Sequence, residues 1–194
     1  MRYMGEGGIR MKEHGVSSYR RFLRGETDAL EVLVTRYSDE LVRFAFGYVK
    51  SEAAAEDVVS DSFATLFMKA KSFSEDDQLR AFLYKIVRNR SVDYLRRHRR
   101  ELPLEDAEGV LSVSNAEDRL LNKERDEALH RCLARLPAQY REVLELTWFE
   151  EFSNEQVASI LGKSAKQVYN LRARAKETLK TMLEKEGITR EDLS

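Results

Sequence analysis

Apolar residues recur every three or four positions through the first half of the chain. From Asp28 onward they are Leu30, Leu33, Val34, Tyr37, Leu41, Phe44, Ala45 and Tyr48. This spacing predicts an amphipathic helix. A second stripe follows Ser51 and runs from Ala55 to Ala70, which predicts a second helix with acidic residues on its opposite face. Residues 72–78 show no period and predict a loop.

The next predicted helix runs from Phe82 to Arg100 and mixes aromatic residues with cations. Eight basic residues lie between Arg80 and Arg100, and Asp93 is the only acid among them. Cations attract phosphates, and interleaved aromatic rings offer faces on which unpaired bases can stack. The alternative is an amphipathic core helix with a solvated, charged end. The composition of this helix does not by itself decide between the two.

The second half of the chain begins with a predicted linker and ends in a helix-turn-helix pattern. Residues 101–122 hold few large apolar groups, and two further helices are predicted on either side of Pro137. Two capping boxes then follow, Ser153-x-x-Gln156 and Ser164-x-x-Gln167, with Gly162 between them as a helix terminator. A plain helical hairpin would explain the caps, but not the cations and amides on the exposed face of the last helix.

These patterns predict an all-α fold with two small helical domains joined by a flexible linker, the C-terminal one a helix-turn-helix. The predicted divisions are a disordered N-terminal extension (1–18), a first domain (19–100), a linker (101–122), a second domain (123–186) and a C-terminal tail (187–194). The run Gly5-Glu-Gly-Gly8 is one that an in-frame ribosome-binding sequence could encode. We therefore hypothesise that Met11 is the natural start and that residues 1–10 are a translated leader.

Charge and composition narrow the class of protein. The 194 residues carry a net charge of −1, but the basic residues gather in two clusters with acidic residues between them, which indicates two contact surfaces. No apolar run is long enough to cross a bilayer, so we expect no membrane insertion. The single cysteine, Cys132, fits a reducing cytoplasm, where we expect the protein to act.

Enzymatic chemistry is not expected. His14, His98 and His130 lie in different segments, and no serine or cysteine has a plausible base nearby in the sequence. His130 and Cys132 are two residues apart on a predicted helix and point to different faces, so they do not form a metal pair. We predict no catalytic residue, no metal and no cofactor.

Taken in order, the motifs resemble the extracytoplasmic-function (ECF) group of sigma-70 family RNA polymerase sigma factors. Residues 55–63 are similar to that family's acidic polymerase-binding helix, and residues 82–100 are similar to its promoter-melting, minus-ten-reading segment. Residues 136–144 and 153–179 look like its minus-35 domain. Larger sigma factors carry a further helical domain between these parts, and the short linker leaves no room for one.

The resemblance implies a sigma factor that binds core RNA polymerase (its clamp helices and flap) and promoter DNA, and it implies an anti-sigma partner. It assigns polymerase binding to Glu56, Asp57, Ser60 and Asp61. It assigns minus-ten DNA to Phe73, Arg80, Tyr84, Lys85, Arg88, Asn89, Arg96 and Arg97, with Phe73 in a loop that captures a flipped base. It assigns minus-35 DNA to Lys166, Gln167, Tyr169, Asn170 and Arg174.

Two features depart from the family pattern. Tyr169 and Leu171 stand where arginine or lysine is frequent, so family promoter preferences do not transfer to this chain. The acidic run Glu75-Asp76-Asp77 is unusual beside DNA and has no explanation in the sequence. Two alternatives stay open: a stand-alone helix-turn-helix regulator that binds duplex DNA, and a module that binds only another protein. Phe73 could equally be a core residue beneath its loop.

Overall fold

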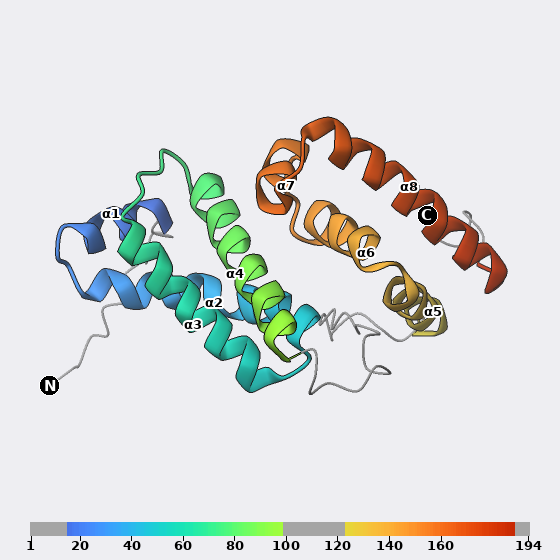
Figure 1. Ribbon diagram of the computed structural model, residues 1–194, viewed down its shortest axis with the longest axis horizontal. Coiled ribbons are helices and arrows are strands. Elements are labelled where there is room, and N and C mark those ends of the chain that lie inside the picture. The colour runs from blue at the N-terminus through green and yellow to red at the C-terminus, as the bar shows by residue number, and fades with distance from the viewer. Residues whose placement is uncertain (1–14, 99–122, 189–194) are drawn as a thin grey trace, which may run out of the picture.

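The computed structural model describes residues 15–98 and 123–188, and within these ranges every regular element is a helix (Figure 1). This confirms the predicted all-α fold. The hypothesis about Met11 and the predicted linker fall on residues outside the described ranges. No helix in the described part of the chain is long and apolar enough to span a membrane.

Four helices form the N-terminal unit: α1 (Gly15–Leu23), α2 (Asp28–Val49), α3 (Glu52–Lys69) and α4 (Asp76–His98). The α2, α3 and α4 helices pack on one another around fully buried leucines and Phe44. The predicted helices after Asp28 and Ser51 are both confirmed. Ser51 caps α3, because its hydroxyl accepts the N–H of Ala54 and so satisfies one of the unpaired donors of the first turn.

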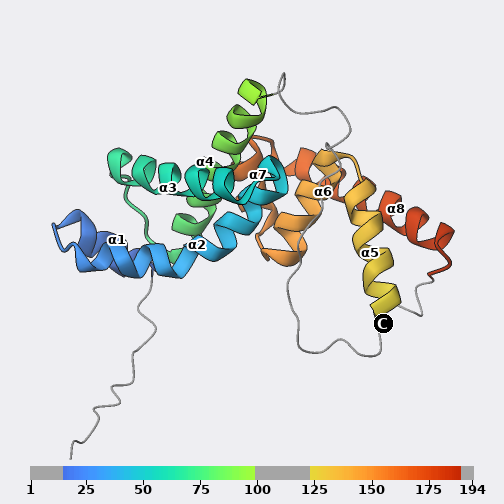
Figure 2. The same ribbon diagram turned by 90° about the horizontal axis from the view of Figure 1, so that it is seen from below.

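The α1 helix corrects the predicted disordered extension. Residues 15–18 are helical, with Val16 and Ser18 buried, so the N-terminal unit begins earlier than residue 19. The first residue of this helix, Gly15, lies so close to Tyr37 that no side chain fits there. A Cβ at this position would lie 2.1 Å from the Tyr37 hydroxyl oxygen. The helix packs on α2 and α4 (Figure 2).

One residue of the acidic run 75–77, Asp76, finds its explanation here. The Asp76 carboxylate accepts the backbone N–H groups of Gly15 (3.0 Å) and Val16 (2.8 Å), and it pairs with Arg36. A carboxylate at a helix N-terminus meets both the unsatisfied donors and the positive end of the helix dipole. Asp76 therefore holds α1 onto the N-terminal unit, and its position beside the predicted DNA surface does not imply a contact with DNA.

The C-terminal unit contains α5 (Lys123–Arg135), α6 (Ala138–Leu144), the π-helix η2 (Glu145–Phe149), α7 (Asn154–Leu161) and α8 (Ala165–Lys185). Both predicted capping boxes are formed, and Gly162 ends α7 in the left-handed region with φ 65°. The helix-turn-helix prediction is confirmed in α7 and α8. The helix predicted after Pro137 is α6, which continues into the π-helical turn η2, a form often found at functional sites.

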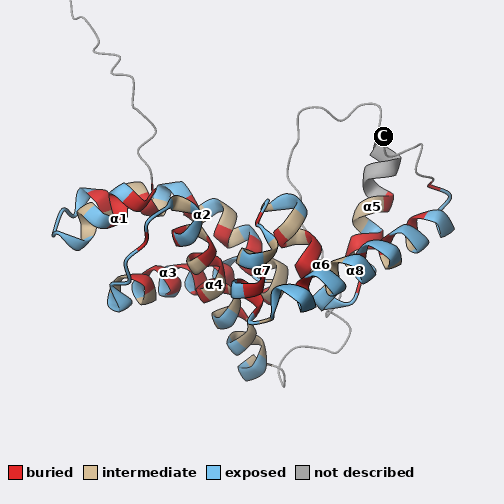
Figure 3. Ribbon diagram, turned by 90° about the horizontal axis from the view of Figure 1, so that it is seen from above, coloured by how far each residue is buried: buried red, intermediate tan, exposed pale blue. Residues whose placement is uncertain are grey.

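The two units touch. The middle of α4 packs against α7, and buried residues lie on both sides of the junction (Figure 3). The sequence predicted two domains separated by a linker and gave no reason to expect them to pack together. This contact decides which of the predicted site residues are accessible.

Candidate polymerase and nucleic-acid interfaces

The four predicted polymerase-binding residues are all exposed on α3, and helical geometry divides them into two pairs. Glu56 and Ser60 stand four residues apart and line an apolar groove of about 720 Å³ between α2 and α3. Asp57 and Asp61, also four apart, line a more polar groove of about 470 Å³ between α3 and α4. The structure therefore presents acids along the edges of two grooves.

The polar groove between α3 and α4 also contains two of the predicted minus-ten residues. Asn89 and Arg97 line it together with Asp57 and Asp61. Asp61 pairs with Arg90 at 2.6 Å, so this acid ties α3 to α4. The predicted minus-ten residues Arg96 and Lys85 also lie on α4, where Arg96 is exposed and Lys85 is half-buried.

The structure corrects the prediction that Phe73 offers its ring to a flipped base. The ring is 5% exposed and packs between Tyr19 and Phe82, with centroid distances of 5.5 and 5.3 Å. Arg20 fixes the loop by donating to the Phe73 carbonyl at 2.7 Å. Phe73 is thus a core residue beneath its loop, the alternative that the sequence left open, because an aromatic ring gains more from burial than from exposure to water.

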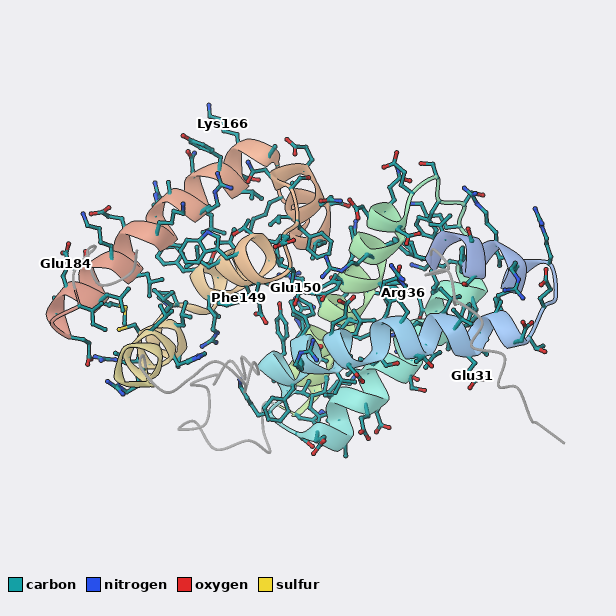
Figure 4. All side chains as sticks on the ribbon, turned by 180° about the vertical axis from the view of Figure 1, so that it is seen from behind. Glu31, Arg36, Phe149, Glu150, Lys166 and Glu184 are labelled. Atoms are coloured by element: carbon teal, nitrogen blue, oxygen red, sulfur yellow. The ribbon has the colours of Figure 1, made fainter. Side chains whose placement is uncertain are left out.

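Three predicted minus-ten residues, Arg80, Tyr84 and Arg88, face the C-terminal unit. They follow one another at helical spacing on α4 and form one stripe. Tyr84 is fully buried, and its hydroxyl bonds to the Glu150 carboxylate. Arg80 pairs with the same carboxylate and donates to the Glu150 carbonyl at 2.7 Å. Figure 4 shows Glu150 between the two units.

Arg88 meets a second carboxylate from the C-terminal unit. Its Nε donates to Glu142 at 2.6 Å, and Tyr48 at the end of α2 also bonds to Glu142. Glu142 is only 9% exposed. A carboxylate so little exposed is stable only when it is paired, and here both of its oxygens meet Arg88.

Burial dominates the electrostatics of this junction. It raises the pKa of the Tyr84 hydroxyl, and the Glu150 carboxylate adds to that rise, so the phenol stays protonated and donates. Burial likewise raises the pKa of Glu150, although Tyr84 and Arg80 oppose the change. Burial and then the nearby Glu150 raise the pKa of Glu145 to about 8.

The predicted minus-35 residues are all exposed on α8, at its first three turns. Figure 4 shows Lys166 pointing away from the body of the protein. Tyr169 is 59% exposed, whereas the preceding residue, Val168, is fully buried in the unit's core. Gln167 differs from the others, because its side-chain oxygen accepts the Ser164 N–H at 2.8 Å as part of the capping box. Its amide is therefore partly committed to the helix cap.

Sequence reasoning missed the partners of α4 at the junction. Glu142, Glu150 and Phe152 come from the C-terminal unit, and each lies more than 50 residues along the chain from the α4 residue that it contacts. No local pattern marks them, since glutamates are common on solvated helix faces. Only the packing of the two units reveals their role.

Metal chemistry has no support in the described ranges. No group of three or more histidine, cysteine, aspartate or glutamate side chains there could hold a metal ion. Cys132 is buried, and burial raises the pKa of its thiol.

Comparisons with known proteins match both units. The family model described as Sigma-70 region 2 matches residues 33–101, and that described as Sigma-70, region 4 matches residues 126–179. The RNA polymerase sigma factor NccH of Alcaligenes xylosoxydans xylosoxydans is 30% identical over 172 residues, which are 85% of this chain and 92% of that protein. The sigma factor SigV of Bacillus subtilis (strain 168) is 26% identical over 160 residues, 82% of this chain and 94% of that protein.

Solved structures give the same fold. The sigma factor RpoE of Bartonella quintana, in complex with the anti-sigma factor NepR, is 26% identical with a TM-score of 0.60 over 80% of this chain and 96% of that chain. CnrH, in complex with the cytosolic domain of CnrY, is 24% identical with a TM-score of 0.62 over 89% of this chain and 98% of that chain.

Both family models match in the order that the motifs predicted, and the relatives align along most of their own length. Stand-alone regulation of duplex DNA is not favoured by these matches. The chain therefore belongs to the ECF group of sigma-70 family sigma factors, which direct promoter-specific initiation by RNA polymerase and are not enzymes.

Proposed function

We propose that the three surfaces of this sigma factor divide the work of initiation: α3 binds core polymerase, α4 holds the opened minus-ten element, and α8 reads the minus-35 element. The observation that carries the proposal is the placement of two cation-rich helices, α4 and α8, on separate units, with an acidic face on a third helix. One helix can then bind each element of a promoter.

The α3 surface suits a cationic helical partner such as the polymerase clamp helices. Glu56 and Ser60 border the apolar groove between α2 and α3, and Asp57 and Asp61 continue the acidic face around α3. An apolar groove with acidic edges can bury one face of a helix and pair with cations beside it. The resemblance to sigma factors supports core RNA polymerase as the protein that supplies this partner helix.

Charge reversal on α3 tests this surface. Asp57→Arg should weaken binding to core polymerase in a pull-down without DNA, because a cation would face cations. Glu31→Arg on α2 is the matched control, since Glu31 is exposed and its substitution changes the charge by the same amount (Figure 4). Equal retention of polymerase by both variants would count against the α3 assignment.

The α8 surface suits the major groove of duplex DNA. The N-terminal turns of a recognition helix contact base edges, and this is where Lys166, Tyr169, Asn170 and Arg174 are exposed. Asn can pair bidentately with adenine and Arg with guanine. Gln167 reads a base only by sharing or giving up its bond to Ser164. We propose Asn170 and Arg174 as the principal base readers.

The α4 surface suits a single strand. Arg80, Lys85, Arg88, Arg96 and Arg97 supply cations for phosphates, Asn89 supplies an amide, and Tyr84 supplies a ring. Stacking of a base on an aromatic ring contributes roughly 1–3 kcal/mol, which helps to hold an opened strand. The buried Phe73 ring would support this surface from beneath.

Reconstitution tests the function as a whole. The protein is added to core RNA polymerase that lacks a sigma factor, with genomic DNA of the same organism as template. Transcripts with defined start points are the expected result, and sequencing their start sites would give the promoter sequence. Tight duplex binding without polymerase, combined with no initiation, would instead support the stand-alone regulator.

We further propose that an anti-sigma factor binds this chain, as CnrY binds CnrH and NepR binds RpoE in the related structures. Because sigma factors act where polymerase is, we place this protein in the cytoplasm. Native mass spectrometry of the tagged protein from its own cells should show a stoichiometric partner distinct from the polymerase subunits. Recovery of only polymerase and the unbound chain under all growth conditions would argue against such a partner.

A further inference from the structure

We infer that the C-terminal unit of this chain competes with promoter DNA for α4: Glu142 and Glu150 take the place of phosphates, and Phe152 takes the place of a stacked base. The inference rests on the proposed role of α4 in holding the opened minus-ten strand. It adds that the free protein closes on itself and must open before α4 can bind that strand.

The two carboxylates are matched to the two arginines that would hold the strand. Arg80 pairs with Glu150 and Arg88 with Glu142, so two anions from one unit meet two successive cations of the other. Both arginines are about one-quarter exposed or less, which leaves little room for a phosphate beside the carboxylate. Charge-assisted bonds of arginine to carboxylate and to phosphate use the same forked geometry.

Phe152 lies where a base would stack, beside the two carboxylates that take the place of phosphates. Its ring meets Tyr84 edge to face, with a centroid distance of 5.0 Å and an angle of 77° between the planes. The Arg80 guanidinium lies over the Phe152 ring at 4.5 Å. Phe152 is 5% exposed, so it fills the space beside Tyr84 that a base would need.

The chemistry of the contact favours opening over permanent closure. A junction held by charged groups is weaker than an apolar one of the same size, because removing the charges from water costs free energy that the pairing must offset. Polar interfaces between units of one chain generally permit relative motion. This junction contains two pairs of carboxyl and guanidinium groups, Glu142 with Arg88 and Glu150 with Arg80, and Tyr48 and Tyr84 contribute polar hydroxyls.

Closure affects the two DNA surfaces unequally. The first turns of α8 stay exposed in the closed structure, whereas the stripe of Arg80, Tyr84 and Arg88 is covered. The closed protein can therefore offer α8 to duplex DNA, while its affinity for a single strand is reduced by the fraction of molecules that are open. Polymerase binding that separates the two units would remove this competition.

The test weakens the contact without touching the proposed DNA or polymerase residues. The double variant Glu142→Gln, Glu150→Gln keeps the shape of both side chains and removes both charges. The matched control is Glu151→Gln, Glu155→Gln, which makes the same change in charge on exposed residues of the same segment. The control separates opening from a general gain in attraction to DNA.

Two measurements on the full-length protein without polymerase read the outcome. The first is resonance energy transfer between dyes at Met68→Cys on α3 and Glu184→Cys on α8, both exposed, with the buried Cys132 left unlabelled. The second is the affinity for a randomised single-stranded DNA of about 15 nucleotides. The interface variant should lose energy transfer and bind the strand about tenfold more tightly, because its open fraction rises. The control variant should change neither by more than about twofold.

The same proteins are then tested for transcription with core polymerase, which separates the two hypotheses. If the interface variant initiates transcription but its energy transfer and strand affinity equal those of the control, the competition inference is overturned and the proposed function stands. If neither the wild type nor the variants initiate transcription, the proposed function fails. Circular dichroism of each variant confirms that the fold is retained.

Discussion

The two helices proposed to bind DNA carry similar side chains but present them very differently. Both α4 and α8 combine cations, an amide and a tyrosine. On α8, Tyr169 stands 59% exposed, whereas Tyr84 on α4 is fully buried between Phe44 of its own unit and Phe152 of the C-terminal unit. Similar side chains are therefore exposed to solvent on α8 and buried in the contact between the units on α4.

This difference shows that residue type does not decide availability. On α8 only Gln167 is partly engaged, by its own helix cap. On α4, Arg88 and Arg80 meet Glu142 and Glu150 of the other unit, and Arg80 also pairs with Glu40 of α2. In the proposed role of α4 in holding opened DNA, its cover would prevent binding to other nucleic acids until polymerase and promoter are present, because an uncovered basic surface binds any nucleic acid.

The largest expected effect is a difference in stability between variants that remove a buried ring, Phe73, and an exposed ring, Tyr169. Phe73→Ala should lower the free energy of unfolding by about 3–5 kcal/mol, because it removes a ring packed between Tyr19 and Phe82. Tyr169→Ala should change it by less than about 0.5 kcal/mol. Chemical denaturation measures both. A stable Phe73→Ala protein that failed only in strand opening, seen by permanganate footprinting, would restore the base-capture role.

The next prediction concerns base reading on the open helix. Arg174→Ala should weaken binding of the holoenzyme to its promoter by about 1–3 kcal/mol, because a bidentate contact to guanine is lost. Selection from a randomised minus-35 element should show relaxed preference at one position. Lys180→Ala, farther along α8, should weaken binding without altering preference. Relaxed preference in the Lys180 variant alone would place the reading face elsewhere.

A third, smaller effect tests the acidic run that borders α4. Asp76→Ala should lower the free energy of unfolding by about 1 kcal/mol, because two backbone N–H groups of α1 lose their acceptor. Asp77→Ala, an exposed neighbour on the same turn, should have almost no effect. Thermal denaturation compares the two. Equal stability of both variants would mean that α1 does not depend on this cap.

The smallest expected effect is a change with pH in the fraction of molecules in which the C-terminal unit covers α4. The pKa of Glu145 is raised to about 8 by burial and by Glu150, and Arg141 opposes the rise. A carboxyl whose pKa is raised on closure favours the closed form most at low pH, and that stability is lost as pH rises through about 8. Energy transfer between the units should therefore fall between about pH 6 and pH 8, with the open fraction rising about threefold.

Lys50 has the opposite tendency but a different window. Burial lowers the pKa of its amine to about 8, so its unfavourable effect on closure is constant below that pH and is relieved only as pH rises further. The response between pH 6 and 8 thus belongs to the buried carboxyls Glu145 and Glu150, and the pKa of Glu145 is raised to about 8. Glu145→Gln should flatten it. An unchanged pH profile in that variant would show that another group is responsible.

Much of the local structure could be predicted because it depends on neighbours in the chain. The periodicity after Asp28 and Ser51 gave two helices, and the two Ser-x-x-Gln boxes gave the start of α7 and α8. The prediction for residues 15–18 was wrong because α1 is held by Asp76 and Tyr37, which are distant in the sequence. The Phe73 prediction was wrong because its packing partners also come from other helices.

The sequence by itself determined the helices other than α1, the order of the two units and the family to which they belong, since caps, hydrophobic period and motif order are all local or linear properties. The tertiary structure alone decided that Phe73 is core, that Asp76 is a helix cap and that Glu142, Glu150 and Phe152 cover α4. Those outcomes depend on contacts between residues roughly 50 to 70 positions apart. A pattern along the chain does not specify which distant residues pack together, because other glutamates and aromatic residues of this sequence would fit the same pattern.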